Sequence, residues 1–179
     1  MTAALAHLAA PPAVESFFAT IGADPLSCAF PRKGGAHPGG PMAPVPAAQL
    51  GTEWDRLMAT PRSRRAVAYV HIPFCENHCL FCGFYQNAWR ADLGTAYVDA
   101  LIAQILAFAR HPAHDGPPLQ AVYLGGGTPT ALSAPDIARL IRAIRRHLPL
   151  APDCEITLEG RLHSFGTDKA RAAFDAGVT

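Results

Sequence analysis

The chain has 179 residues, of which 50% are hydrophobic and 16% are charged, and its formal net charge is +1. This length and composition suit one modest globular domain with a packed core. The near-neutral charge gives no electrostatic basis for binding nucleic acid, and the first ten residues lack the basic flank and long apolar run of a signal peptide.

Residues 1–65 are predicted to form an irregular leader. The many prolines and glycines at 31–46 cannot sustain a helix or a central strand, and only two short helices, at 14–20 and 47–58, are expected in the leader. From residue 66 onward the pattern changes to alternating strands and helices. We therefore divide the chain into the leader, 1–65, and a core region, 66–179.

The core region predicts three successive strand–loop–helix units. Strands are expected at 66–72, 121–124 and 155–159. Helices are expected at 95–110, from a cap at Ser133 onward, and at 167–176, where Gly177 ends the last one. Such alternation predicts parallel strands with the helices packed outside, and functional residues at the carboxyl ends of the strands. The arginines at 139–146 are expected to form a solvated helix face.

The chain is expected to be cytoplasmic and not inserted in a membrane. Its best candidate for a membrane span, 97–109, is interrupted by Asp99 and Gln104. In the cytoplasm the five cysteines are reduced, so a tight cysteine cluster indicates metal binding rather than a disulfide. Cys28 and Cys154 lie far from the cluster in sequence and are expected to be small buried hydrophobes.

Cys75, Cys79 and Cys82 form a C-x3-C-x2-C motif directly after the first predicted strand. A [4Fe-4S] cluster normally takes one cysteine per iron, so three cysteines leave one iron with an open coordination position, where chemistry can occur. The alternatives are a zinc site completed by His71 or His78, and three core cysteines that bind no metal.

Two further motifs follow the second and third predicted strands. The glycines at 125–127 let a ligand approach the backbone and leave N–H groups to bind it, although such a run can also be only a tight turn. Glu159 can accept hydrogen bonds from ribose hydroxyls or an amine, although a lone glutamate is often a solvated strand end. All three motifs fall at the same predicted rim, which indicates one site.

Taken together, these motifs resemble the radical S-adenosylmethionine (SAM) superfamily, in its branch of oxygen-independent coproporphyrinogen III oxidases and their relatives. The resemblance covers about 66–179 and rests on Tyr69, the segment His71-Ile-Pro-Phe-Cys75 with the cysteine motif, the Gly-Gly-Gly-Thr-Pro-Thr run and the segment Ile156-Thr-Leu-Glu-Gly160. It implies the N-terminal part of a partial (β/α)6 barrel with about three of its units present. The chain would then be a fragment that is inactive alone.

The resemblance also implies two cofactors, a [4Fe-4S] cluster on the three cysteines and a SAM molecule that chelates the open iron. Electron transfer from the reduced cluster would cleave SAM and yield a 5′-deoxyadenosyl radical, with electrons from a reductase or a flavodoxin-type donor. By motif, Tyr69 and Phe81 would line the SAM pocket. Gly126, Gly127 and Thr128 would contact its methionine end, and Glu159 would bind its ribose hydroxyls.

The residues after the third cysteine bear on the substrate. Coproporphyrinogen oxidases carry a further cysteine where this chain has Phe84, and Gly83 departs from the pattern of the related haem chaperones. The segment 82–87 and parts of the leader are instead similar to haem-utilisation radical SAM enzymes of the HutW/ChuW type. These act on haem anaerobically, with SAM as methyl donor and radical source, and release its iron. This resemblance favours haem degradation over the two alternatives, a coproporphyrinogen III oxidase and a haem chaperone.

Overall fold

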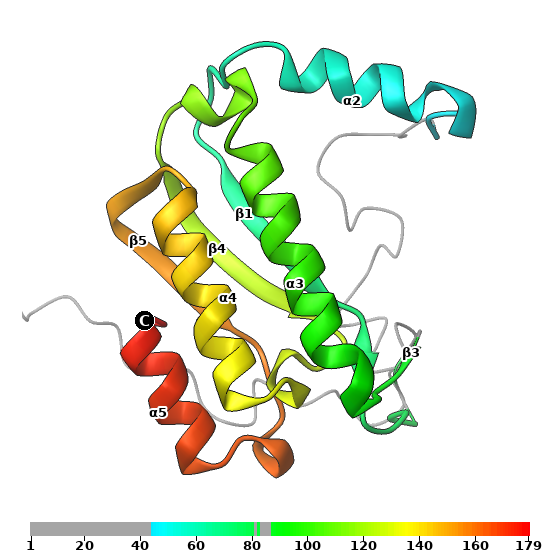
Figure 1. The fold of residues 1–179 in the computed structure, drawn as a ribbon, viewed down its shortest axis with the longest axis vertical. Helices are drawn as coiled ribbons and strands as arrows, with labels where there is room; N and C mark the ends of the chain where they lie inside the picture. The colour runs from blue at the N-terminus through cyan, green and yellow to red at the C-terminus, as the bar shows by residue number, and fades with distance from the viewer. Residues whose placement is uncertain (1–43, 81, 83–86) are drawn as a thin grey trace, which may run out of the picture. The chain divides into compact units, whose positions relative to one another are not determined.

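The computed structural model describes residues 44–80, 82 and 87–179, and residues 47–179 form one compact unit. Three strand–helix pairs follow one another along this unit, as Figure 1 shows. They are β1 (Val67–Ile72) with α3 (Ala91–Phe108), β4 (Leu119–Gly126) with α4 (Ala134–His147), and β5 (Leu150–Leu158) with α5 (Thr167–Ala176). A helix at Leu50–Met58, α2, precedes them.

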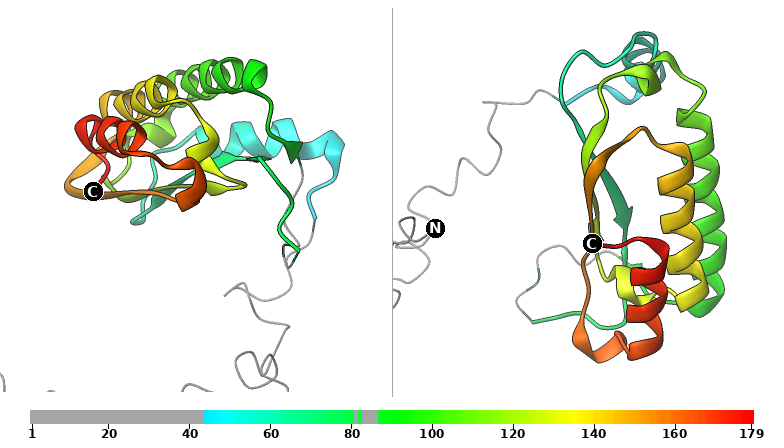
Figure 2. Two further views of the ribbon diagram at one scale, coloured as in Figure 1. Left: turned by 90° about the horizontal axis from the view of Figure 1, so that it is seen from below. Right: turned by 90° about the vertical axis from the view of Figure 1, so that its left-hand side faces the viewer.

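The three long strands form a parallel sheet in the order β1-β4-β5. In its register Tyr69 lies opposite Tyr123, which lies opposite Thr157. Parallel neighbours require crossover connections, and α3 and α4 provide them. Helices α3, α4 and α5 all lie on one face of the sheet (Figure 2), so the other face carries none of the three. The predicted α/β architecture with a parallel sheet is therefore confirmed.

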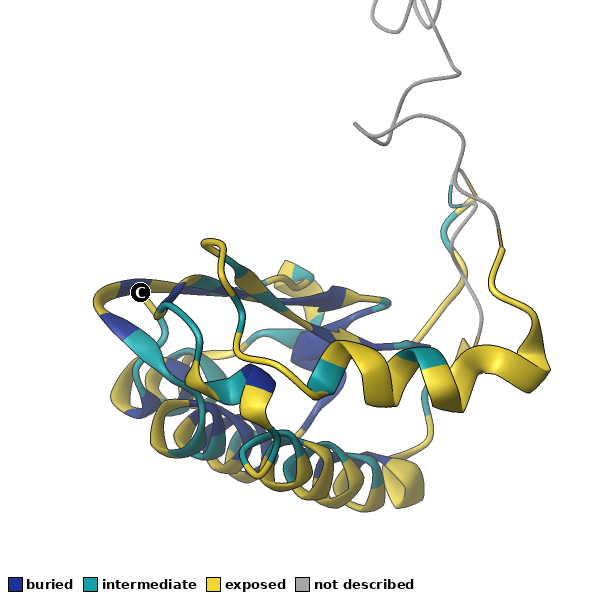
Figure 3. Cartoon of the chain, turned by 90° about the horizontal axis from the view of Figure 1, so that it is seen from above, coloured by how far each residue is buried: buried dark blue, intermediate teal, exposed yellow. Residues whose placement is uncertain are grey.

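The hydrophobic core is formed by residues of the sheet and of these helices, and Figure 3 shows buried positions in dark blue on both layers. Four apolar residues on one side of α4 are fully buried, at 0 or 1% exposure: Ile137, Leu140, Ile141 and Ile144. Val122, Leu124 and Ile156 face them from the sheet and are equally buried. Each such side chain stabilises the fold by about 1.5–3 kcal/mol relative to an exposed one.

The N-terminus of α4 is fixed by a buried aspartate. Ser133 caps the helix as predicted, because its Oγ accepts a hydrogen bond from the Asp136 backbone N–H at 3.2 Å. The Asp136 carboxylate in turn accepts hydrogen bonds from Thr95 of α3 and from Arg139. Arg139 also pairs with Asp99 of α3. This arginine therefore joins two helices, and it is exposed like Arg142, Arg145 and Arg146, as a solvated face predicts.

Two strands start earlier than the sequence predicts, and β4 begins at Leu119 rather than at residue 121. Strand β5 starts at Leu150 rather than at residue 155, although it contains Pro152. Leu150 pairs with Leu119 and Glu155 with Ala121, so the register shifts between these pairs and Pro152 lies in the irregular stretch. A bulge accommodates a residue that lacks the backbone N–H, which is why proline does not end this strand.

The sequence predicts a loop at the first cysteine, but Cys75 lies on a short strand. Strand β2 (Phe74–Cys75) pairs in parallel with β3 (Asn87–Ala88). The Trp89 backbone N–H donates to the Cys75 carbonyl oxygen at 2.8 Å and extends this pairing. The two ends of the cysteine segment are thus tied together beside the sheet.

Within the described part of the chain, α3 is long and apolar enough to cross a membrane, judged by length and composition alone. Many of its exposed positions are alanines, at 96, 100, 103 and 107, while Val98 is fully buried against the core. Asp99 is engaged by Arg139, which further ties α3 to α4. One such helix is weak evidence for a span.

Candidate functional site

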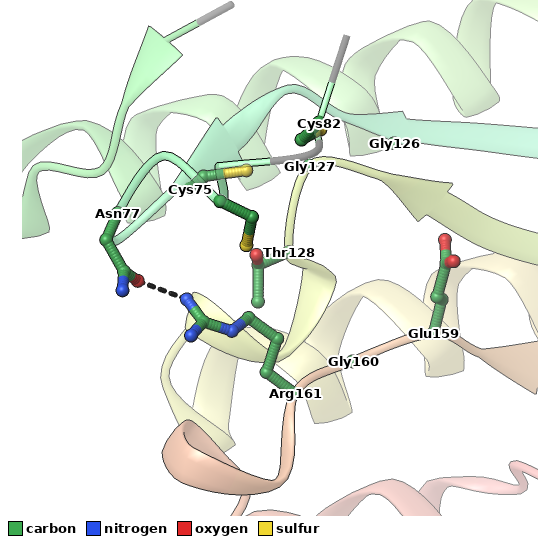
Figure 4. A pocket seen from close by; sticks show the side chains of 10 residues that line it. Cys75, Asn77, Cys82, Gly126, Gly127, Thr128, Glu159, Gly160 and Arg161 are labelled. Carbon is green, nitrogen blue, oxygen red and sulfur yellow. Dashed lines mark hydrogen bonds between the residues drawn. The ribbon is translucent and has the colours of Figure 1, made fainter. Parts of the chain in front are cut away.

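A pocket of about 260 Å³ lies at the carboxyl ends of β1, β4 and β5. It is lined by Cys75, Asn77, Cys79, Cys82, Gly126, Gly127, Thr128, Glu159, Gly160 and Arg161. Figure 4 shows these residues, with Asn77 and Arg161 on one side of the pocket and Glu159 on the other. All three motifs predicted to share one rim therefore contribute to one cavity.

The three thiols reach the pocket from one segment whose turns are fixed by hydrogen bonds. Cys75 is held on β2, and the Cys82 backbone N–H donates to the Cys79 carbonyl oxygen at 3.0 Å. His78 Nε2 donates to the Cys82 carbonyl oxygen at 3.1 Å. All three cysteines are half-buried.

The donor set suits a cluster of several irons better than a single zinc ion. Neither His71 nor His78, the candidate fourth zinc ligands, is among the residues that line the pocket. Across the described ranges, no three Cys, His, Asp or Glu side chains lie close enough to hold one metal ion. Three separated thiols, with no fourth cysteine and no histidine among the lining residues, fit a cluster that takes one cysteine on each of three irons.

The glycine run allows the end of β4 to touch the backbone that leads to Cys75. Gly126 has a φ of 116°, a conformation that strongly favours glycine. A Cβ at Gly127 would lie 2.5 Å from the Phe74 carbonyl oxygen. The Gly127 and Thr128 N–H groups donate to the carbonyls of Ile72 and Phe74, at 2.8 and 2.7 Å. The expectation that the glycine run leaves N–H groups for a ligand is therefore wrong for Gly127, and the N–H of the following Thr128 is also used within the protein.

Glu159 continues the sheet past the end of β5, since its backbone N–H donates to the Leu124 carbonyl oxygen at 3.0 Å. Its carboxylate lies beside Tyr123. The negative charge of Glu159 is the main cause that raises the pKa of the Tyr123 phenol, and partial burial adds to it. Glu159 thus projects as an exposed carboxylate at the pocket edge.

Seven of the nine predicted site residues line the pocket: the three cysteines, Gly126, Gly127, Thr128 and Glu159. Tyr69 does not; it lines a second groove of about 470 Å³ along β1 and stacks on Tyr123 with a centroid distance of 6.2 Å. Phe81 lies outside the described residues.

Sequence reasoning missed Asn77, Tyr123, Gly160 and Arg161 as components of the site or its edge. A signal existed for Arg161, because a basic residue two positions after Glu159 lies just past the same strand end. No local signal marks Asn77, whose partner is 84 residues away.

The sequence model of the radical SAM superfamily matches residues 69–179, well over half of the chain. The chain belongs to the radical SAM superfamily. This radical SAM chain is 50% identical over 138 residues to an anaerobilin synthase from Escherichia coli O157:H7, a match that covers 75% of the chain and 31% of that relative. It is 36% identical over 98 residues to the heme chaperone HemW of a Synechocystis strain, which covers 51% of the chain and 23% of that relative.

A solved structure shares the fold. It is the coproporphyrinogen III oxidase HemN from Escherichia coli, described as a radical SAM enzyme, with a TM-score of 0.62 and 28% identity over 71% of the chain and 29% of that structure. The coproporphyrinogen oxidase-like branch is therefore confirmed, and the parallel α/β fold resembles part of the HemN fold, in agreement with the predicted partial barrel. The radical SAM chain spans less than a third of the length of each of these proteins.

Proposed function

We propose that this chain forms the N-terminal part of the cofactor-binding barrel of an enzyme that degrades haem without oxygen and releases its iron. The observation that carries the proposal is the 50% identity to an anaerobilin synthase over 138 residues. The matches to a coproporphyrinogen III oxidase, at 38% over 92 residues, and to HemW proteins are weaker and shorter. The residues after the third cysteine support the same ranking, because Phe84 departs from the pattern of coproporphyrinogen oxidases and Gly83 from that of haem chaperones.

In this proposal the pocket holds a [4Fe-4S] cluster and SAM. When bound together, the two cofactors supply the one-electron reductive cleavage of SAM, with electrons from a reductase or a flavodoxin-type protein. Cys75, Cys79 and Cys82 anchor the cluster through their thiolates. The composition of the pocket supports this set, since its lining includes these three thiols and neither candidate histidine.

The other pocket residues orient SAM in this proposal. Glu159 accepts hydrogen bonds from the ribose hydroxyls, for which an exposed carboxylate at the rim is suited. Thr128, which is 2% exposed, and the glycine loop form the wall beside the methionine end. Tyr69 and Phe81 stay predictions for the SAM pocket.

The deciding experiment uses the full-length protein, loaded with its cluster and reduced under anaerobic conditions. With SAM and haem present, we expect loss of the haem absorbance band, release of chelatable iron and consumption of SAM. Cys75→Ser should abolish the cluster and all three signals, whereas Arg146→Gln, on the exposed face of α4, should leave them unchanged. Intact haem after SAM has been cleaved would refute the proposal.

The same preparation separates the two alternatives, which the similarity to HemN and HemW keeps open. A coproporphyrinogen III oxidase would release carbon dioxide from coproporphyrinogen III. A haem chaperone would pass intact haem to an acceptor protein with little 5′-deoxyadenosine formed. A cytoplasmic location is part of the proposal and fits the oxygen-sensitive chemistry.

A further inference from the structure

Arg161 places a positive charge in the pocket beside a neutral partner. It is half-buried and lines the cavity together with the three cysteines and Glu159. Its guanidinium donates one hydrogen bond, from Nη1 to the Asn77 side-chain oxygen (Figure 4). No ion pair with Arg161 occurs among residues 44–80, 82 and 87–179. Because Asn77 is neutral, this contact does not compensate the charge of Arg161.

The backbone at Arg161 is fixed, so the side chain starts from a defined point. The Arg161 N–H donates to Thr130 Oγ1 at 3.1 Å, and Thr130 is 1% exposed. The Thr130 carbonyl oxygen accepts a hydrogen bond from Lys169 Nζ at 2.8 Å, and Gly160 packs so tightly on Thr130 that a side chain there would collide with it. The backbone of Arg161 is therefore already ordered, and binding a ligand through its side chain does not require the backbone to become ordered first.

The chemistry of the unused donors indicates a carboxylate. A guanidinium has five N–H donors in a planar fork that matches the two oxygens of a carboxylate. One donor is used by Asn77, which leaves the others for a ligand. Glu159 stands on the opposite side of the pocket and would repel a carboxylate there. The pocket is thus polarised, with a site for hydroxyl or amine donors at Glu159 and a site for an anion at Arg161.

We infer that Arg161 binds a carboxylate group of the ligand held in this pocket. Two ligands supply such a carboxylate: SAM through its methionyl carboxylate, and the tetrapyrrole through a propionate. Only the tetrapyrrole propionate rests on the proposed haem degradation. The inference makes Arg161 a ligand-binding residue that sets which end of the ligand faces the cysteine segment.

The test measures binding rather than turnover, with the cluster-loaded full-length protein. Each of two ligands is paired with an analogue that lacks the carboxylate: SAM with decarboxylated SAM, and haem with haem dimethyl ester. Dissociation constants are measured for wild type, Arg161→Gln and Arg161→Lys, with Arg146→Gln as the matched control. Iron content and the cluster absorbance spectrum are recorded for every variant.

For the pair that contains the true ligand, wild type should prefer the carboxylate form, and Arg161→Gln should weaken that form about tenfold or more while leaving its analogue unchanged. Arg161→Lys should fall between the two, because it keeps the charge and loses the fork. Asn77→Ala should keep the preference, since it removes the hydrogen bond and retains the cation.

The pair that responds identifies the source of the carboxylate. An unchanged preference in Arg161→Gln for both pairs, with iron content intact, would overturn the inference and leave Arg161 as a structural link to Asn77. A loss of preference in Asn77→Ala equal to that in Arg161→Gln would overturn it too. If Arg161→Gln loses its cluster, the comparison of Arg161→Lys with wild type decides, and equal preferences there would refute the carboxylate contact. These outcomes do not depend on whether haem is degraded.

Discussion

Replacing Gly127 by alanine should separate the glycine loop from the strand that carries Cys75. The added Cβ would lie 2.5 Å from the Phe74 carbonyl oxygen and 2.8 Å from its backbone carbon and nitrogen, where ordinary contacts begin at 3.4 Å. The obstructing atoms belong to the backbone, so no side-chain rotation can relieve the collision. The end of β4 must instead move away from β2.

The expected cost follows from these contacts. Overpacking of this kind typically destabilises a protein by about 1–3 kcal/mol. The displacement also lengthens the hydrogen bonds from Gly127 to Ile72 and from Thr128 to Phe74, each worth about 1 kcal/mol. We therefore expect Gly127→Ala to lower the free energy of unfolding by at least about 2 kcal/mol.

The assay compares chemical denaturation curves and the iron bound after cluster reconstitution, with Gly51→Ala as the control. Gly51 lies in α2, and a Cβ added there would meet no atom within 4 Å, so alanine should stabilise the helix by up to about 1 kcal/mol. Gly127→Ala should lose both stability and iron. A variant as stable as wild type, with the same iron content, would refute the argument that this glycine is required by backbone contact.

Three further predictions concern other parts of the chain. Glu159→Gln should lower the pKa of Tyr123 toward its ordinary value, which a titration of the tyrosinate absorbance measures. Because the pKa of Tyr123 is raised in the folded state, the wild-type protein loses stability as the pH rises through the range in which tyrosine ionises. The variant should lose less stability over the same range. Cys154, whose pKa is raised mainly by burial, should be alkylated more slowly in the cluster-free chain than the three pocket cysteines, as measured by peptide mass spectrometry, and equal rates would contradict this. Ser133→Ala should cost about 1 kcal/mol of stability in denaturation experiments through loss of the cap on α4, and an unchanged midpoint would exclude that role.

The elements with local sequence signals are those that the sequence predicts best. Helix α5 spans Thr167–Ala176 as predicted, because Gly177 adopts a left-handed conformation with φ of 109° and ends it. Helix α4 begins after Ser133 because the cap is encoded by that residue and Asp136. Both signals act within one turn of helix and do not depend on the rest of the fold.

Features created by tertiary contact were not predictable in the same way. The pairing of β2 with β3 involves two residues on each side, too few for any periodicity. The long β5 depends on a bulge that admits Pro152, which local rules treat as a strand end. Helix α3 starts at Ala91 rather than at residue 95, and we find no capping side chain that explains this start.

The pocket is lined by two kinds of residue with different roles. Gly126, Gly127 and the backbone of Thr128 are used in contacts within the protein, which bring the end of β4 against the cysteine segment. Glu159 and Arg161 are instead fixed by their backbones and present charged side chains to the cavity. Changes at the glycines should therefore lower stability and cluster content together. Changes at the two charged residues should mainly alter ligand binding. At the exposed Glu159 stability should stay close to wild type, because surface substitutions usually shift it by about 0.5 kcal/mol or less.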